Sequence, residues 1–315
     1  MKPVKFSEEA EEVLETIIAV TPSIVRATWK ERISTHAQSK AALEGRKAIS
    51  RDDILKSAKE VMPSGFGPLF LKMMSPEKFK ELSKSGVEGY RAAARRWVKI
   101  NVKVNTAGKK TITRRSEKPY ILSICGSPRK GGNTDLLVKK INEGAELAGA
   151  RCETIYLHNK KIGYCIGCRK CREEGSRIED FCVIKDDMTE IYKKLCEADG
   201  IVIGYPIYTA RESAQTATFW DRLDCWSNAY NRERFGGRKP GILVMSWAWF
   251  EPDTYMDQME GMLMLMSLRN IEPVAAVTAS GCRGTAHGRG VVVQDEKGMN
   301  KVFNVGKKLA QIIKS

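Results

Sequence analysis

The chain has 315 residues, of which 42% are hydrophobic and 29% are charged, with a formal net charge of +15. These values describe a globular protein with room for two domains. They exclude a membrane-spanning protein, because no apolar run approaches the roughly 20 residues that cross a bilayer.

The first residues show no apolar stretch of the signal-peptide type. Nine cysteines, an odd number, suit a reducing compartment better than a disulfide framework. We therefore expect a cytoplasmic protein with no membrane partner.

Positive charge is concentrated in the first third of the chain. Residues 1–119 hold 25 lysines and arginines against 14 acidic residues, whereas the rest holds 28 against 24. Such a segment can attract nucleic acid, an anionic partner or an acidic electron carrier. The basic residues are interspersed with acidic ones, however, which favours an ordinary solvated helical surface over a nucleic-acid site.

Residues 7–61 have the apolar spacing of helices. Ser7 precedes two glutamates, as an N-cap does, and apolar residues then recur at helical spacing over 10–18. Thr21-Pro22 predicts a second helix start and Ser50 a third. Three short amphipathic helices must bury their apolar stripes on one another, so a small helical domain is predicted.

Two stretches of this domain carry a resemblance to a known module. They are Pro22-x-Ile24-Val25-Arg26 with Glu31-Arg32, and Ile49-Ser50-Arg51-Asp52-Asp53. With them the segment resembles the small helical module at the C-terminus of light-independent protochlorophyllide reductase subunits. The resemblance implies that residues 1–65 form a docking module for a partner near redox machinery, without a catalytic site.

Residues 66–118 are predicted to be an irregular or helical linker and arm. A break at 62–68, rich in proline and glycine, ends the helical pattern. Residues 97–104 alternate apolar and polar side chains, which indicates either an edge strand or an extended arm. The polar, basic segment 105–118 then leads into the main domain, predicted at 119–315.

From Tyr120 the pattern changes to alternating strands and helices. Strands are expected at 120–125, 151–157, 200–204, 241–246 and 273–278, and helices at 135–148, 187–196, 213–229, 252–268 and 299–313. This alternation predicts an α/β domain with a parallel sheet covered on both faces. Ligands in such sheets bind at the C-terminal ends of the strands.

The first of these strands runs into a loop of residues 126–134, called the phosphate loop below. Backbone N–H groups and the positive end of the following helix suit an anion there. Serine, threonine and asparagine add donors, and arginine and lysine add charge; the candidate ligands are Ser127, Arg129, Lys130, Gly132, Asn133 and Thr134. The loop matches neither the P-loop signature nor Gly-x-Gly-x-x-Gly, so a phosphate monoester is the expected ligand, with a simple tight turn as the alternative.

Four cysteines occur close together in residues 165–182, called the cysteine loop below. Cys165, Cys168 and Cys171 form a Cys-x2-Cys-x2-Cys run, and Cys182 follows after ten residues. Four thiolates at compact spacing favour a 4Fe–4S cluster. A four-cysteine zinc site is the alternative, although zinc ligands come more often as two separated Cys-x2-Cys pairs.

A third candidate site lies at Pro206-Ile207-Tyr208. Proline is expected to stop the preceding strand at its C-terminal end, where cofactors bind. Tyr208 offers an aromatic face, with an ordinary loop aromatic as the alternative. Trp247 and Trp249 are expected to be structural or lid residues.

Four features follow one another in residues 119–315. They are Gly126-Ser127-Pro128-Arg129-x3-Asn133-Thr134, the cysteine run ending in Cys182-Val-Ile-Lys-Asp186-Asp187-Met188, Pro206-Ile207-Tyr208, and Ser213 with Phe219-x-Asp221-Arg222. With them this region resembles the iron–sulfur flavoprotein branch of the NADPH-dependent FMN reductase family, which is flavodoxin-like. The resemblance implies a five-stranded parallel sheet of order 2-1-3-4-5.

The resemblance also implies two cofactors, FMN and a 4Fe–4S cluster. The FMN phosphate would lie on residues 127–134 and the ring against Pro206, Ile207 and Tyr208, with Ser213 nearby and the loop at Trp247 as a cover. A homodimer or homotetramer would bring the cluster of one subunit near the FMN of another. The gap before Cys182 is longer than the family's usual four to seven residues, which makes this cysteine the ligand to check.

Two functions remain from the sequence. The first is an FMN-dependent oxidoreductase that passes electrons between a 4Fe–4S cluster and FMN, with ferredoxin or NAD(P)H as donor and no catalytic acid or base. The second is a docking or scaffold protein with a structural zinc or cluster site, serving a larger redox or nucleic-acid complex. The remaining cysteines, Cys225 among them, are expected to be packing residues.

Overall fold

A computed structural model describes residues 4–19, 21, 23–62, 98–105, 107–172, 181–226, 236–249, 252–282 and 290–315. The chain divides into two compact units, Met1–Lys84 and Ser85–Ser315. Over the described ranges, every helix is too short or too polar to cross a membrane.

The first unit is the expected set of three helices. Its elements are β1 (Lys5–Phe6), α1 (Glu8–Ala19), the 3-10 turn η1 (Ser23–Val25), α2 (Arg26–Leu43), β2 (Ala48–Ile49) and α3 (Arg51–Val61). The apolar stripe of α1 is buried against α2 and α3. Ser50 caps α3 through a reciprocal pair of hydrogen bonds with Asp53, which is the capping box that fixes a helix start. Likeness of this unit to the protochlorophyllide reductase module stays a prediction.

The second unit is built on one mixed sheet. Its strands are β3 (Lys99–Val104), β4 (Tyr120–Cys125), β5 (Arg151–Tyr156), β6 (Gly200–Tyr208), β7 (Arg211–Glu212), β8 (Lys239–Ser246) and β9 (Ile271–Ser280). They lie in the order β3-β9-β8-β6-β4-β5, with β7 paired to β6. The five mutually parallel strands, numbered along the chain, read 2-1-3-4-5, which is the flavodoxin-like doubly wound arrangement.

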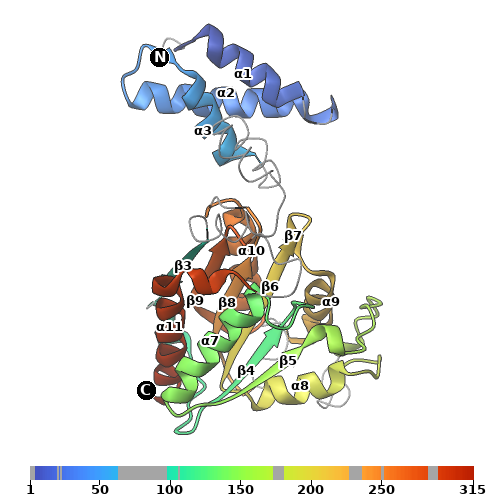
Figure 1. Cartoon of the computed structure of the whole chain (residues 1–315). Helices are drawn as coiled ribbons and strands as arrows, with labels where there is room; N and C mark the ends of the chain where they lie inside the picture. Colours follow the sequence, from blue (N-terminus) through green and yellow to red (C-terminus); the bar gives the residue numbers. More distant parts are fainter. Residues whose placement is uncertain are drawn as a thin grey trace. The chain divides into compact units, whose positions relative to one another are not determined.

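Helices cover both faces of this sheet (Figure 1). They are α7 (Asn133–Leu147), α8 (Met188–Glu197), α9 (Ala214–Arg222), α10 (Met256–Leu268) and α11 (Glu296–Lys314), with the 3-10 turns η3 (Ala107–Thr111), η4 (Leu157–Asn159), η5 (Lys170–Arg172), η7 (Leu223–Trp226) and η8 (Val292–Gln294). Val202 on β6 packs in the core with α7 and α11, whereas its neighbours Ile201 and Ile203 pack in the core with α8, α9 and α10. Burial on both faces explains why these strands are continuous apolar runs.

The sheet extends beyond the five strands expected, because β3 pairs antiparallel with β9. Val98 and Ile100 are buried in the core beside α11, and the Ile100 amide donates to Asp295 at 2.8 Å. The sheet is therefore mixed rather than wholly parallel. Part of the segment predicted as a linker, 66–118, belongs to the main domain as its edge strand, so that domain begins before residue 119.

Pro206 does not stop its strand as expected. It aligns with Ser246 of β8, and β6 continues through Ile207 and Tyr208, which pair with β7. A proline is tolerated there because the hairpin to β7 supplies the pairing that keeps the next residues extended. The helix expected over 213–229 is also shorter than predicted, because α9 ends at Arg222 and the 3-10 turn η7 follows it.

Candidate functional site

The C-terminal ends of β4, β6 and β8 meet at one edge of the sheet. The Gly126 amide donates to the carbonyl of Gly204 at 2.8 Å, and the Ser213 hydroxyl donates to the carbonyl of Gly126 at 2.7 Å. The hydroxyls of Thr134 and Ser246 lie 2.7 Å apart. Chain order reverses between β4 and β6, so this edge is the topological switch point at which doubly wound proteins bind ligands.

The phosphate loop has the local geometry of an anion site. The Ser127 hydroxyl accepts from the Arg129 amide at 3.2 Å, and the Gly132 amide donates to the Arg129 carbonyl at 3.0 Å, so the loop folds back on itself. Arg129 and Lys130 are exposed at its tip. Gly132 is the N-cap of α7, and it has no side chain to satisfy the first-turn amides of that helix. An anion at this position would meet backbone donors and the positive helix end.

Asn133 and Thr134 are buried and already serve the fold. The Asn133 amide oxygen accepts from the backbone amides of Val291 and Val292 at 2.7 and 3.1 Å. Thr134 shares its hydrogen bond with Ser246. Both residues therefore join the phosphate loop to distant segments, and a direct bond from either side chain to a phosphate stays a prediction.

Asp135 is a part of this region that the sequence did not single out. Its carboxylate is fully buried and accepts from the Gly131 amide at 2.6 Å, the Tyr156 hydroxyl at 2.8 Å and the Lys139 ammonium at 2.9 Å. Burial raises the pKa of Asp135, but these donors outweigh it and leave that pKa below its ordinary value. An acidic residue in the first turn of α7 was the available signal.

The flavin-ring candidates lie at the end of β6. Pro206 and Ile207 are buried, and Tyr208 is 39% exposed beside the turn to β7. Trp247 was expected as part of a cover, but its indole is 2% exposed and packs edge-on against Tyr255 at 5.4 Å. Trp247 is therefore a core residue in this structure, since the end of β8 lies beneath α10.

All four cysteines of the cysteine loop line one cavity of about 220 Å³. Cys165 and Cys168 are exposed, whereas Cys171 and Cys182 are half-buried. Gly167 and Arg169 have positive φ values of 66° and 60°, which turn the chain tightly between the first thiols. The Gly167 amide donates to the Cys165 sulfur at 3.5 Å.

The thiols share a cavity without forming a closed metal site. Over the described ranges, no three histidine, cysteine, aspartate or glutamate side chains lie close enough to hold one ion. Four cysteine sulfurs from two segments are nevertheless the donor set of an iron–sulfur cluster, and zinc takes the same set. The residues fit such a group by their chemistry and shared cavity, while the ligand assignment stays a prediction.

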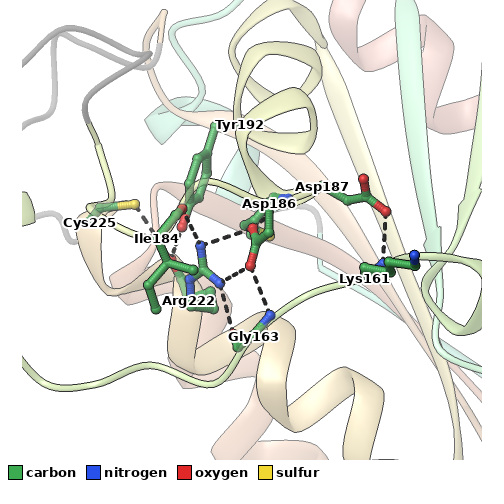
Figure 2. Close-up of polar contacts among 9 residues, drawn as sticks. Lys161, Gly163, Ile184, Asp186, Asp187, Tyr192, Arg222 and Cys225 are labelled. Atoms are coloured by element: carbon green, nitrogen blue, oxygen red, sulfur yellow. Dashed lines mark hydrogen bonds and ion pairs between the residues drawn. The ribbon is translucent and has the colours of Figure 1, made fainter.

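Arg222 and Asp186 join the two ends of the cysteine loop (Figure 2). Arg222 ends α9 with a fully buried side chain, and its Nη1 donates to the Gly163 carbonyl at 2.8 Å and to Asp186 at 2.6 Å. Its Nη2 donates to the Ile184 carbonyl at 3.2 Å. Asp186 also accepts from the amides of Gly163 and Met188. Two motifs that are distant in sequence are thus one structural unit, which their spacing could not show.

A second acidic residue fixes the loop from the side of the thiols. Asp224 accepts from Arg172, the residue after Cys171, at 2.6 Å, and from Arg269 at 3.3 Å. Burial raises the pKa of Cys171, and the charge of Asp224 raises it further. Asp224 therefore ties the segment after Cys171 to two arginines on this side of the cavity.

Cys225 also lines this cavity, although the sequence predicted only packing. Its thiol is 4% exposed and donates to the Arg222 carbonyl at 3.6 Å. Its burial raises the pKa of the Cys225 thiol to about 12. Cys225 is therefore a fifth thiol at the site, and the substitutions below distinguish it from Cys182.

Comparisons with known proteins identify the family of the main domain. The model of the NADPH-dependent FMN reductase family matches residues 119–287. An iron–sulfur flavoprotein of Methanocaldococcus jannaschii is 32% identical over 195 residues, which are 62% of this chain and 97% of that protein.

Two further relatives are also named iron–sulfur flavoproteins. One from Archaeoglobus fulgidus is 30% identical over 197 residues, covering 62% of this chain and 80% of that protein. One from Methanosarcina thermophila is 39% identical over 102 residues, covering 32% of this chain and 51% of that protein.

Proposed function

This chain belongs to the NADPH-dependent FMN reductase family, among its iron–sulfur flavoproteins, and we propose that it is an oxidoreductase using FMN and a 4Fe–4S cluster. The observation that carries the proposal is the cavity that Cys165, Cys168, Cys171 and Cys182 share. A family member that needed only FMN would have no use for four thiols around one cavity.

The residues that would hold FMN lie at the switch point. Backbone amides of the phosphate loop and the start of α7 would bind its phosphate, with Arg129 and Lys130 adding charge. Tyr208 and the end of β6 would contact the ring. Ser213 would act indirectly, because its hydroxyl already holds the Gly126 carbonyl and so fixes the loop.

The cofactors would supply the chemistry: the cluster exchanges single electrons and FMN one or two, so the pair links one- and two-electron donors and acceptors. The chain itself would bind and orient them. Arg169, Lys170 and Arg172 beside the thiols would favour the more negative, reduced state of the site. No side chain needs to act as an acid or base.

The surface around the thiols supports contact with partners. Tyr164 and Ile166 are 79% and 68% exposed on either side of Cys165, and Val183 is 43% exposed beside Cys182. Apolar side chains around an exposed redox site suit contact with another protein. We propose a homodimer or homotetramer, ferredoxin or NAD(P)H as donor, a docking role for the N-terminal unit, and a reducing, cytoplasmic location that keeps the thiols free.

Anaerobic purification tests this proposal. The expected protein is coloured, with flavin absorbance, a broad iron–sulfur absorbance and bound iron and sulfide. A Cys168→Ser variant should keep FMN and lose iron. Reduction by NADPH, NADH and reduced ferredoxin, compared at equal concentration, would identify the donor.

A colourless protein loaded with zinc would support the scaffold function instead. In that case the cysteine loop would be a structural site, and removal of zinc by a chelator would unfold the loop.

A further inference from the structure

Arg222 has a position that ties it to the cysteine loop rather than to the general fold. Its guanidinium binds the Gly163 carbonyl, two residues before Cys165, and the Ile184 carbonyl, two residues after Cys182. The chain segments that carry the first and last predicted ligands are therefore held by one rigid, planar group. Their separation is set by the fork of the guanidinium.

The ion pair with Asp186 makes this buried charge tolerable. The Arg222 side chain is fully buried and Asp186 is 13% exposed, with contacts of 2.6 and 3.2 Å between them. Burial alone would lower the pKa of Arg222, but the hydrogen bond to Asp186 and nearby groups raise it. The guanidinium is therefore a permanent positive charge in the wall of the cysteine cavity.

One N–H of this group has no acceptor in the part of the chain that the structure describes. Nη1 and Nη2 each donate to two acceptors, which uses all of their hydrogens. The remaining donor, Nε, is buried and has no hydrogen-bond partner among the residues that the structure describes. A buried donor without an acceptor is costly and rare in folded proteins, so it needs an explanation.

Resting on the proposed function, we propose that Arg222 is the positioning residue of the cluster and that its Nε–H donates to a cluster or cysteine sulfur. Three observations support this. Arg222 lines the same cavity as the four cysteines, its guanidinium holds both ends of their loop, and its buried Nε–H has no acceptor among the described residues.

Arg222 should also affect the reduction potential of the cluster. N–H···S hydrogen bonds and a positive charge stabilise the more negative, reduced cluster and raise its reduction potential. Loss of the Nε–H should therefore shift the potential to more negative values, and loss of the fork should loosen the cluster. A merely structural arginine would affect folding but leave the potential unchanged.

Arg222→Lys tests the proposal in the full-length, loaded protein. Lysine keeps the charge but has neither Nε–H nor a planar fork. Arg238→Lys is the matched control, because Arg238 is also largely buried and paired with a carboxylate, Glu272, yet does not line the cysteine cavity. The measurements are FMN and iron content, release of iron to a chelator, and the midpoint potential from a titration followed by electron paramagnetic resonance.

We expect Arg222→Lys to keep FMN, to show a more negative potential and to hold iron about 10- to 100-fold more weakly. Arg238→Lys should match the wild type in potential and iron retention. Wild-type values in Arg222→Lys, or equal changes in both variants, would overturn the inference.

Two further outcomes are decisive. If Arg222→Lys does not fold, Asp186→Asn takes its place, because it removes the carboxylate that pairs with the guanidinium and leaves Arg222 itself in place. Faster loss of iron with FMN intact supports the inference. Unchanged iron retention overturns it. Wild-type protein that binds no iron would overturn the proposed function, and this inference with it, whereas a loaded wild type with an unaffected Arg222 variant overturns the inference alone.

Discussion

The phosphate loop and the cysteine loop follow neighbouring parallel strands, β4 and β5, and leave the sheet at the same edge. The phosphate loop is short and passes directly into α7, and its turn is closed by its own backbone and by Ser127. The cysteine loop is long, and its ends are joined by Arg222 from a different element. The short loop closes its own turn and is then joined to distant segments by Asn133 and Ser213. The long loop needs a distant side chain to bring its ends together, because closing a longer loop costs more chain entropy.

An aspartate just beyond the end of each loop helps to hold that loop: Asp135 is fully buried, and Asp186 is 13% exposed. Asp135 accepts from an amide of the phosphate loop, and Asp186 accepts from amides at both ends of the cysteine loop. If the two loops are independent, damage to one should leave the cofactor of the other in place.

The largest effect is expected from the cysteines themselves. Cys182→Ser should abolish iron binding while FMN content stays at the wild-type level, because a cluster needs four thiolates. Cys225→Ser should retain iron, since its thiol is already hydrogen-bonded to the Arg222 carbonyl. Iron and flavin analysis of both variants tests this prediction. Loss of iron in Cys225→Ser and its retention in Cys182→Ser would make Cys225 the fourth ligand.

The next effect separates the two aspartates. Asp186→Asn leaves the buried Arg222 without its counter-charge and should lower the free energy of unfolding by about 3–5 kcal/mol, with loss of iron before FMN. Asp135→Asn should lower the free energy of unfolding by only about 1–3 kcal/mol, because its partner Lys139 is half-exposed. It should also weaken FMN retention, because Asp135 accepts from an amide of the phosphate loop. Urea unfolding and cofactor analysis measure both; loss of the same cofactor in the two variants would show that the loops are coupled.

Glycine substitutions extend the contrast to the backbone. A Cβ at Gly126 would lie 1.9 Å from the Thr216 hydroxyl, so Gly126→Ala should force the phosphate loop away from α9 and cost about 1–3 kcal/mol. A Cβ at Gly167 meets nothing within 4 Å, so Gly167→Ala should cost only the strain of its φ of 66°, about 1 kcal/mol. Thermal unfolding and FMN titration compare them; an equal FMN affinity in both variants contradicts the steric argument.

The smallest effect is a dependence on pH. Burial raises the pKa of Asp186, but Arg222 and two backbone amides outweigh it, so that pKa lies below the ordinary value of 3.8. The carboxylate therefore stabilises the folded state above the unfolded pKa, and this contribution is lost as the pH falls through the lower, folded pKa.

The difference in unfolding free energy between wild type and Asp186→Asn should thus be complete near about pH 6 and should shrink below about pH 4. Denaturant unfolding of both proteins, freed of cofactors, measures it. A difference that stays constant down to about pH 3 would contradict the assignment of the charge to Asp186.

Most elements of the fold were predictable because their signals are local. Buried strands appear as continuous apolar runs, and Ser50 with Asp53 marks a helix start within four residues. Predictions stayed open or failed where pairing partners are distant. The alternation in 97–104 could not show whether β3 joins the sheet, and Pro206 could not show that β7 would continue its strand.

Short stretches of sequence supply the donors: four cysteines, a phosphate-type loop and the family motifs lie in segments whose chemistry does not depend on the rest of the chain. How these donors are held depends on contacts between distant segments. Asp186 and Arg222 lie 36 residues apart, and their contact follows from the packing of α9 against the cysteine loop. The same packing buries the Nε–H, which has no acceptor among the described residues, and places the fifth thiol, Cys225, at the cavity. The spacing of residues in the sequence shows which chemical groups are available. Contacts between distant segments depend on how the whole core packs.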